Sequence, residues 1–221
     1  MFERILVPLD GSEVAEAVMP YVRELARGQG SEVDVVGVSD PPGALERLLK
    51  TYLDRIAEGF LAEGTKARAV ILMGRVAEEI IDYAEQNDIS LIAMATHGRS
   101  GVTRWALGSV ADRVLRGGSV PLLMINPRLA PGPREGGKLF ENILLPLDGS
   151  KLSEMALPYA QGLAKRSATR VCLLRVSPPR HLIMDTGEYM VTNVEETVRG
   201  LEGSALAYLS QVEESLKGTG L

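Results

Sequence analysis

The sequence is poor in the residues that mark several common classes of protein. It has one cysteine in 221 residues, Cys172, which lies in an apolar run, so a disulfide framework is excluded. Aromatic residues make up 5% of the chain, too few for the stacking platforms that bind single-stranded nucleic acid. The net charge is −5, and no basic stripe is present. We therefore expect no nucleic-acid partner.

Long apolar runs are also missing. No stretch approaches the about 20 residues that cross a bilayer, and the N-terminus enters a short apolar strand without a signal-peptide layout. These features predict a cytoplasmic protein with no membrane partner. The remaining composition, 45% apolar and 24% charged residues, is that of an ordinary globular chain.

The chain contains an internal repeat. Residues 2–27 and 140–165 align without a gap at an offset of 138 (140 minus 2), and 14 of the 26 aligned residues are identical. The same register continues through Val33 and Val171, and through Val38 and Val176. Chance does not produce such a match, so the sequence indicates a duplication.

The first copy alternates strand and helix patterns. Apolar runs predict strands at residues 5–9, 33–38, 68–73, 89–95 and 120–125. Helical spacing predicts a helix after the Asp10-Gly11-Ser12 turn, with Asp10 or Ser12 as its N-cap, and helices at 45–61, 76–86 and 109–116. This alternation predicts an α/β fold: a doubly wound, five-stranded parallel sheet with helices on both faces.

The second copy is shorter. We expect a complete domain at residues 1–126, a linker rich in Pro, Gly and charge at 127–138, and an incomplete copy at 139–221 that has a partial βαβα pattern. An inserted loop at about 180–192 precedes its second helix. Two strands bury too little surface to be stable alone, so we expect this copy to dock on something.

A glycine-rich loop between the fourth strand and the last helix is the most informative segment. In open α/β sheets, ligands bind beyond the carboxyl ends of the strands, where the strand order reverses. The Asp10 turn and this loop would meet there. Small residues let backbone N–H groups approach an anion, and the start of the next helix at Ser109 favours negative charge.

The loop carries the resemblance to a known family. The sequence has Ala95-x-x-Gly98, nine residues from Arg99 to Leu107, and then Gly108-Ser109. It resembles the universal stress protein family, whose nucleotide-binding members have Gly-x-x-Gly, nine residues, and Gly-Ser or Gly-Thr. Ala95 departs from that pattern and leaves a methyl group beside the expected path of the ribose and phosphates.

The resemblance implies a ligand and a set of contacts. The ligand would be ATP, or ADP or AMP, with Mg²⁺ as an optional companion. The implied contacts are Pro8, Asp10, Val38, Ala95, Gly98, Arg99, Gly108, Ser109 and Val110. The function implied is a stress-response or signalling module with an unknown protein partner. Because the second copy lacks the loop, we expect it to bind no nucleotide.

Structural explanations compete with binding at each position. Asp10 would serve as a cap without any ligand, since Asp148 keeps the same turn in the second copy. Gly98 and Gly108 would suit turns with positive φ, and Ser109, with Asp112 three residues on, would suit a capping box. His97 would be a packed loop residue and not a catalytic one. A nucleotide-free protein that works through dimerisation therefore remains an alternative.

Enzyme motifs are absent from the sequence. It has no P-loop, no Gly-x-Ser-x-Gly elbow and no metal-ligand spacing, so slow ATP hydrolysis is the most that we expect.

The fifth strand predicts an assembly. Strand 120–125 is apolar and contains Pro121, which suits a sheet edge. We therefore expect a homodimer through this strand, with strand 143–147 of the second copy pairing across the same dimer.

Overall fold

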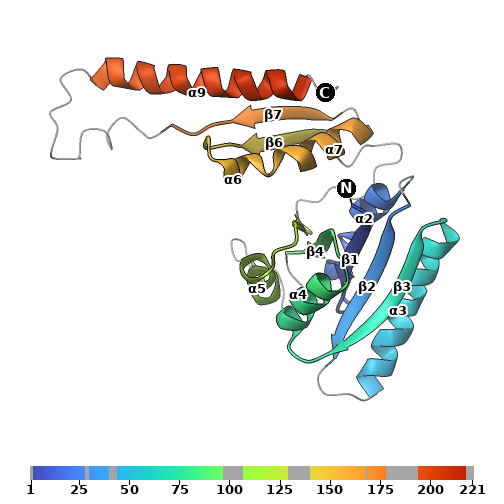
Figure 1. Ribbon diagram of the computed structural model, residues 1–221. Helices are drawn as coiled ribbons and strands as arrows, with labels where there is room; N and C mark the ends of the chain where they lie inside the picture. Colours follow the sequence, from blue (N-terminus) through green and yellow to red (C-terminus); the bar gives the residue numbers. More distant parts are fainter. Residues whose placement is uncertain are drawn as a thin grey trace. The chain divides into compact units, whose positions relative to one another are not determined.

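The computed structural model describes residues 2–27, 30–39, 44–96, 107–128, 140–167, 169–177 and 194–217. The chain divides into two compact units, Met1–Leu139 and Phe140–Leu221. Figure 1 shows both, and each is described by itself.

The first unit is a five-stranded parallel sheet with strand order β3-β2-β1-β4-β5. Its elements are β1 (Arg4–Pro8), α1 (Glu13–Glu16), α2 (Met19–Ala26), β2 (Glu32–Ser39), α3 (Ala44–Ala62), β3 (Lys66–Met73), α4 (Val76–Gln86), β4 (Leu91–Ala95), α5 (Ser109–Gly117) and β5 (Leu122–Ile125). The doubly wound fold predicted from the sequence is confirmed, and the predicted boundaries agree with the observed ones to within two residues.

The helix predicted after the first strand is in fact two helices. The helix α1 ends at Glu16, and α2 begins at Met19, with Pro20 in its first turn. Proline has no N–H to give to a preceding turn, but at the start of a helix that group has no partner in any case. Pro20 therefore starts a new helix where the periodicity alone predicts one continuous helix.

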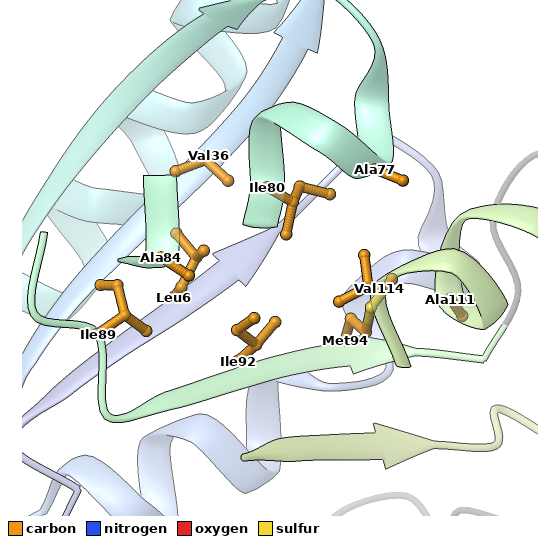
Figure 2. Packing of buried hydrophobic residues seen from close by; sticks show 10 residues of the cluster. All are labelled: Leu6, Val36, Ala77, Ile80, Ala84, Ile89, Ile92, Met94, Ala111 and Val114. Carbon is orange, nitrogen blue, oxygen red and sulfur yellow. The ribbon is translucent and has the colours of Figure 1, made fainter. Parts of the chain in front are cut away.

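The two faces of the sheet are covered by different helices. On one face, Leu6 of β1 and Val36 of β2 pack with Ile80 and Ala84 of α4, and Figure 2 shows Val114 of α5 beside Met94 of β4. On the other face, α3 packs against β2 and β3. Consecutive residues are fully buried in both central strands: Ile5, Leu6 and Val7 in β1, and Val35 and Val36 in β2. Such runs are expected of central parallel strands that are covered on both faces.

A buried carboxylate ties β2 to its neighbours. Asp34 is 1% exposed and accepts two hydrogen bonds from Arg68 of β3, at 2.7 and 2.9 Å. The Tyr83 hydroxyl of α4 donates a third at 3.0 Å, and Arg4 Nε lies 3.7 Å from the same carboxylate. The hydrogen bonds to Asp34 raise the pKa of the Arg68 guanidinium. This cluster links three strands, β1, β2 and β3, and the helix α4 at the amino-terminal half of the sheet.

The second unit repeats the start of the first. Its described elements are β6 (Asn142–Pro146), α6 (Lys151–Glu154), α7 (Leu157–Ser167), β7 (Arg170–Leu174) and α9 (Val194–Lys217). Ile143 pairs with Val171 in a parallel ladder, and Ile5 pairs with Val33 in the same way. The Tyr208 hydroxyl of α9 donates to Glu154 at 2.9 Å. The repeat therefore preserves strand register as well as sequence.

One face of the second unit differs from the first. Leu144 and Leu174 occupy the repeat positions of Leu6 and Val36. They are 61% and 39% exposed, whereas Leu6 and Val36 are fully buried. The apolar cluster of this unit lies on the opposite face, where Leu145 and Leu147 pack with Val212 and Leu216 of α9. Within the residues described, α7 and α9 cover only one face of this sheet.

Among the described residues, none of the helices combines the length and apolar character that a membrane span requires.

We predict that Asp34→Ala lowers the free energy of unfolding by about 2–3 kcal/mol, because three donors lose a charged acceptor in a buried position. Urea denaturation of the full chain, followed by circular dichroism, measures the change. Glu32→Gln is the matched control. Glu32 lies on the same strand and accepts from Arg4 and Lys66, but it is exposed to solvent, so its loss should cost clearly less stability than the loss of Asp34. Equal effects of the two substitutions would contradict the role assigned to Asp34.

Candidate functional site

The candidate site is a cleft at the carboxyl edge of the first sheet. Strand order reverses between β1 and β4, which pair in parallel through Ile5 with Leu91 and Leu6 with Ile92. The crossover helices diverge at such a point and leave a crevice. The cleft has a volume of about 280 Å³ and is lined by Pro8, Leu9, Asp10, Ala15, Val36, Val38, Val76, Ile80, Met94, Ala95, Thr96, Gly108, Ser109, Val110 and Ala111. This size is near the lower end of the about 300–1,000 Å³ of small-molecule pockets.

The turn after β1 forms one wall. Asp10 Oδ1 accepts hydrogen bonds from the backbone N–H of Ser12 at 3.0 Å and from its hydroxyl at 2.6 Å. Ser12 is the N-cap of α1, and its hydroxyl accepts from Ala15 N–H at 3.2 Å. Gly11 has φ of 79°, a conformation that favours glycine. Of the two predicted caps, Ser12 is therefore the cap, and Asp10 orients it.

The second unit builds the same turn. Asp148 accepts from Ser150 N–H at 2.8 Å, and the Ser150 hydroxyl accepts from Ser153 N–H at 3.1 Å. Hydrogen bonds from Ser150 and Ser153 hold the pKa of the Asp148 carboxyl at about 2. The turn therefore has a structural role in both copies, whatever Asp10 does in addition.

A contact from α3 supports this wall. The Tyr52 hydroxyl donates to Glu16 of α1 at 2.8 Å. Burial and the neighbouring Glu16 carboxylate raise the pKa of Tyr52, so the phenol stays protonated and remains a donor at neutral pH. This hydrogen bond ties the short helix α1 to the long helix α3, and so supports the Asp10 turn that precedes α1.

The opposite wall is the end of β4 and the start of α5. Thr96 N–H donates to Ile125 at 2.8 Å, and the Thr96 carbonyl accepts from Gly108 N–H at 2.9 Å. These two bonds fasten both ends of the segment between Thr96 and Gly108 to the sheet. The first turn of α5 is thereby held beside the carboxyl end of β4.

The start of α5 corrects one structural explanation offered by the sequence. The N-cap is Gly108 and not Ser109, and no side chain caps the helix. Asp112 forms an i,i+4 ion pair with Arg116 at 3.0 Å, so the predicted capping box is wrong. Gly108 has φ of −60°, which any residue adopts, so a left-handed turn does not explain this glycine. Among the described residues, no side chain accepts a hydrogen bond from the first N–H groups of α5.

Most of the residues implied by the family resemblance lie together. Pro8, Asp10, Val38, Ala95, Gly108, Ser109 and Val110 all line the cleft. Gly98 and Arg99 fall outside the described residues, as does His97. The sequence did not single out Thr96, Val76, Ile80 or Met94 as lining residues. Val76 and Ile80 lie on α4, outside every motif that the sequence offered, and only the folded sheet brings them to the cleft.

Among the residues that the structure describes, no group of three or more His, Cys, Asp or Glu side chains is placed to hold a metal ion.

The comparisons with known proteins agree on one family. A profile of the universal stress protein family matches residues 1–126. A universal stress protein of Thermus aquaticus is 32% identical over 136 residues, which cover 57% of this chain and 99% of that protein. Universal stress protein MJ0577 of Methanocaldococcus jannaschii is 25% identical over 154 residues, or 57% of this chain and 95% of that protein.

Solved structures extend the similarity. The structure of MJ0577 matches with a TM-score of 0.54 at 26% identity, and covers 57% of this chain and 96% of that chain. A universal stress protein from Archaeoglobus fulgidus matches 97% of this chain and 84% of its own, with a TM-score of 0.68 at 25% identity. The profile alone spans more than half of the sequence. This chain belongs to the universal stress protein family.

Proposed function

We propose that the cleft of the first unit binds an adenine nucleotide, with ATP as the principal ligand, and that the protein acts as a nucleotide-dependent module of the stress response. One observation carries the proposal. The cleft at the strand-order reversal opens onto an uncapped helix start at Gly108-Ser109, at the spacing that the family motif gives to the phosphate loop.

The two sides of the cleft suit the two halves of a nucleotide. Val36, Val38, Ile80 and Met94 offer apolar surface for a base. At the other side, the first turn of α5 presents N–H groups and the positive end of the helix dipole, which stabilise phosphate. Asp10 lies in the wall between strand and helix, where a carboxylate would accept a hydrogen bond from a ribose hydroxyl.

Ala95 bears on the alternative of a nucleotide-free protein. Its side chain is 6% exposed and forms part of the cleft wall, and the cleft keeps a volume of about 280 Å³ with that methyl group in place. The departure from the family glycine therefore does not fill the cleft, which favours binding over the nucleotide-free alternative. Any Mg²⁺ would arrive with the phosphates of the nucleotide.

We predict that Gly108→Val abolishes nucleotide binding and leaves the fold intact. The backbone angles at Gly108 tolerate valine, whereas the added side chain would stand where phosphate approaches the α5 amides. Each charge-assisted hydrogen bond lost costs about 1.5–3 kcal/mol. Isothermal titration calorimetry of the full chain with ATP measures the effect, and circular dichroism checks the fold.

Gly59→Ala is the matched control. Gly59 belongs to the same unit, and an added Cβ there would lie at an ordinary 3.6 Å from Arg23. This variant should bind ATP like the parent chain, with one nucleotide per chain in both. Undiminished binding by Gly108→Val, or two nucleotides per chain, would rule out the site as proposed.

The duplication offers a second test, which separates capping from ligand contact. We predict that Asp10→Ala and Asp148→Ala each weaken their own turn, but that only Asp10→Ala lowers nucleotide affinity, by about tenfold for one lost hydrogen bond to a charged group. The same calorimetric titration compares the two. If both variants retain full affinity, Asp10 orients Ser12 and makes no contact with the ligand.

We also propose a homodimer through β5. This strand is an edge of the sheet, and its segment Leu122–Ile125 has no charged side chain. The other edge, β3, carries Lys66 and Arg68, and charges of this kind protect an edge from pairing. Two copies related by a two-fold axis would join their β5 edges. Strand β6 could pair across the same axis, as the sequence suggested.

Light scattering at micromolar concentration tests the dimer. The parent chain should have the molar mass of two chains. The Leu123→Lys variant should have the molar mass of a single chain, because the dimer would bury a charge at the joined edges. Leu115→Lys is the control, since Leu115 is an exposed leucine of α5 in the same unit. A parent chain that is monomeric under these conditions would overturn the proposal.

A further inference from the structure

The cleft has a neighbour that the family motif does not include. A second hollow of about 250 Å³ is lined by Arg75, Val76, Ala77, Glu78, Ser109, Val110 and Arg113. It shares Val76, Ser109 and Val110 with the cleft. The two hollows therefore meet around the first turn of α5, where the phosphate of a bound nucleotide is proposed to lie.

The hollow lies between two helix starts. Arg75 is the N-cap of α4, and neither α4 nor α5 has a side-chain cap. Arg113 follows Ser109 by four residues and thus lies on the same face of α5. Helical side chains tilt toward the N-terminus, which brings the Arg113 guanidinium back toward Ser109. Two arginines and the first turns of two helices thus line one small space, and the arginine side chains, 82% and 66% exposed, are accessible to a ligand from solvent.

Glu78, the one acidic residue among those that line the hollow, lies near both arginines but forms no hydrogen bond with either. Glu78 Oε1 lies 3.6 Å from Arg75 Nη1 and 3.9 Å from Arg113 Nη1, and both distances exceed hydrogen-bond length. Glu78 Oε2 is buried and has no hydrogen-bond partner among the described residues. The carboxylate therefore balances one positive charge between the two arginines without occupying their N–H donors, and the hollow keeps an excess positive charge.

We propose that this hollow holds the distal phosphates of the nucleotide, so that Arg75 and Arg113 make the site select a triphosphate over a monophosphate. The inference rests on the proposed nucleotide site. A monophosphate placed at Ser109 stops at the shared rim, whereas the β- and γ-phosphates continue into the hollow and receive the two guanidinium groups. Arginine is well suited to this contact because its planar fork donates two parallel hydrogen bonds to phosphate oxygens.

Glu78 sets the strength of that preference. Its carboxylate competes with phosphate for the same two guanidinium groups, so triphosphate binding must displace it. Removing the charge of Glu78 should strengthen triphosphate binding, and removing the arginines should weaken it. These opposite directions do not follow from a general loss of folding.

The experiment is calorimetric titration of the full chain with ATP and with AMP, in EDTA so that no divalent cation holds the phosphates. For the parent chain we expect ATP to bind at least about tenfold more tightly than AMP. In the double variant Arg75→Gln, Arg113→Gln, the ratio of the two affinities should fall toward one, and in Glu78→Gln it should rise. Arg116→Gln is the control, because Arg116 lies on the same helix but pairs with Asp112, and its ratio should match that of the parent.

The outcomes separate this inference from the proposed function. Equal affinities of the parent chain for ATP and AMP, or an unchanged ratio in the double variant, would overturn the role of the hollow while the nucleotide site stands. A parent chain that binds neither nucleotide would overturn both. A fall of the ratio in Arg116→Gln as large as in the double variant would show that general surface charge, and not the hollow, sets the preference.

Discussion

The pairing of β1 with β4 is the contact on which the site depends. Two strands separated by about 80 residues lie side by side through Ile5 with Leu91 and Leu6 with Ile92. Strands β2 and β3 lie on one side of β1, and β4 and β5 lie on its other side. The crossover helices therefore diverge at the β1–β4 pair. The Asp10 turn and the start of α5 then face each other across the gap, and the arginine-lined hollow follows from the position of α4 beside them.

The duplication shows which features belong to folding and which to the site. The Asp-Gly-Ser turn, its capping serine and the Tyr–Glu contact between helices occur in both units. These features therefore need no ligand to explain them. The end of β4, the uncapped start of α5 and the arginines Arg75 and Arg113 are described in the first unit alone. The case for binding rests on this second group, and Asp10 adds to it only by its position.

Much of the fold followed from the sequence because local pattern and global order agree. Buried parallel strands must be apolar on both faces, so they appear as short apolar runs, and the turn after β1 carries its own cap. The break before Pro20 was missed because the helical periodicity continues across it. The cap at Gly108 was missed because Ser109 suits that position equally well. The Asp34 cluster and the second hollow could not be predicted, since they join residues such as Arg68 and Tyr83, or Arg75 and Arg113, that only the sheet register and the packing of α4 and α5 bring together.

The Tyr–Glu contact that both units share also shows where the two copies differ in length. Glu154 lies 138 residues after Glu16, but Tyr208 lies 156 residues after Tyr52, so the second unit has 18 more residues (156 minus 138) between the two contact partners. The helix nevertheless meets the same partner through the same two atoms. The spacing between β6 and β7 equals that between β1 and β2, whereas the spacing between β7 and α9 exceeds that between β2 and α3. For protein engineering, a change of length is therefore better placed between the second strand and the long helix of a unit than between its first two strands.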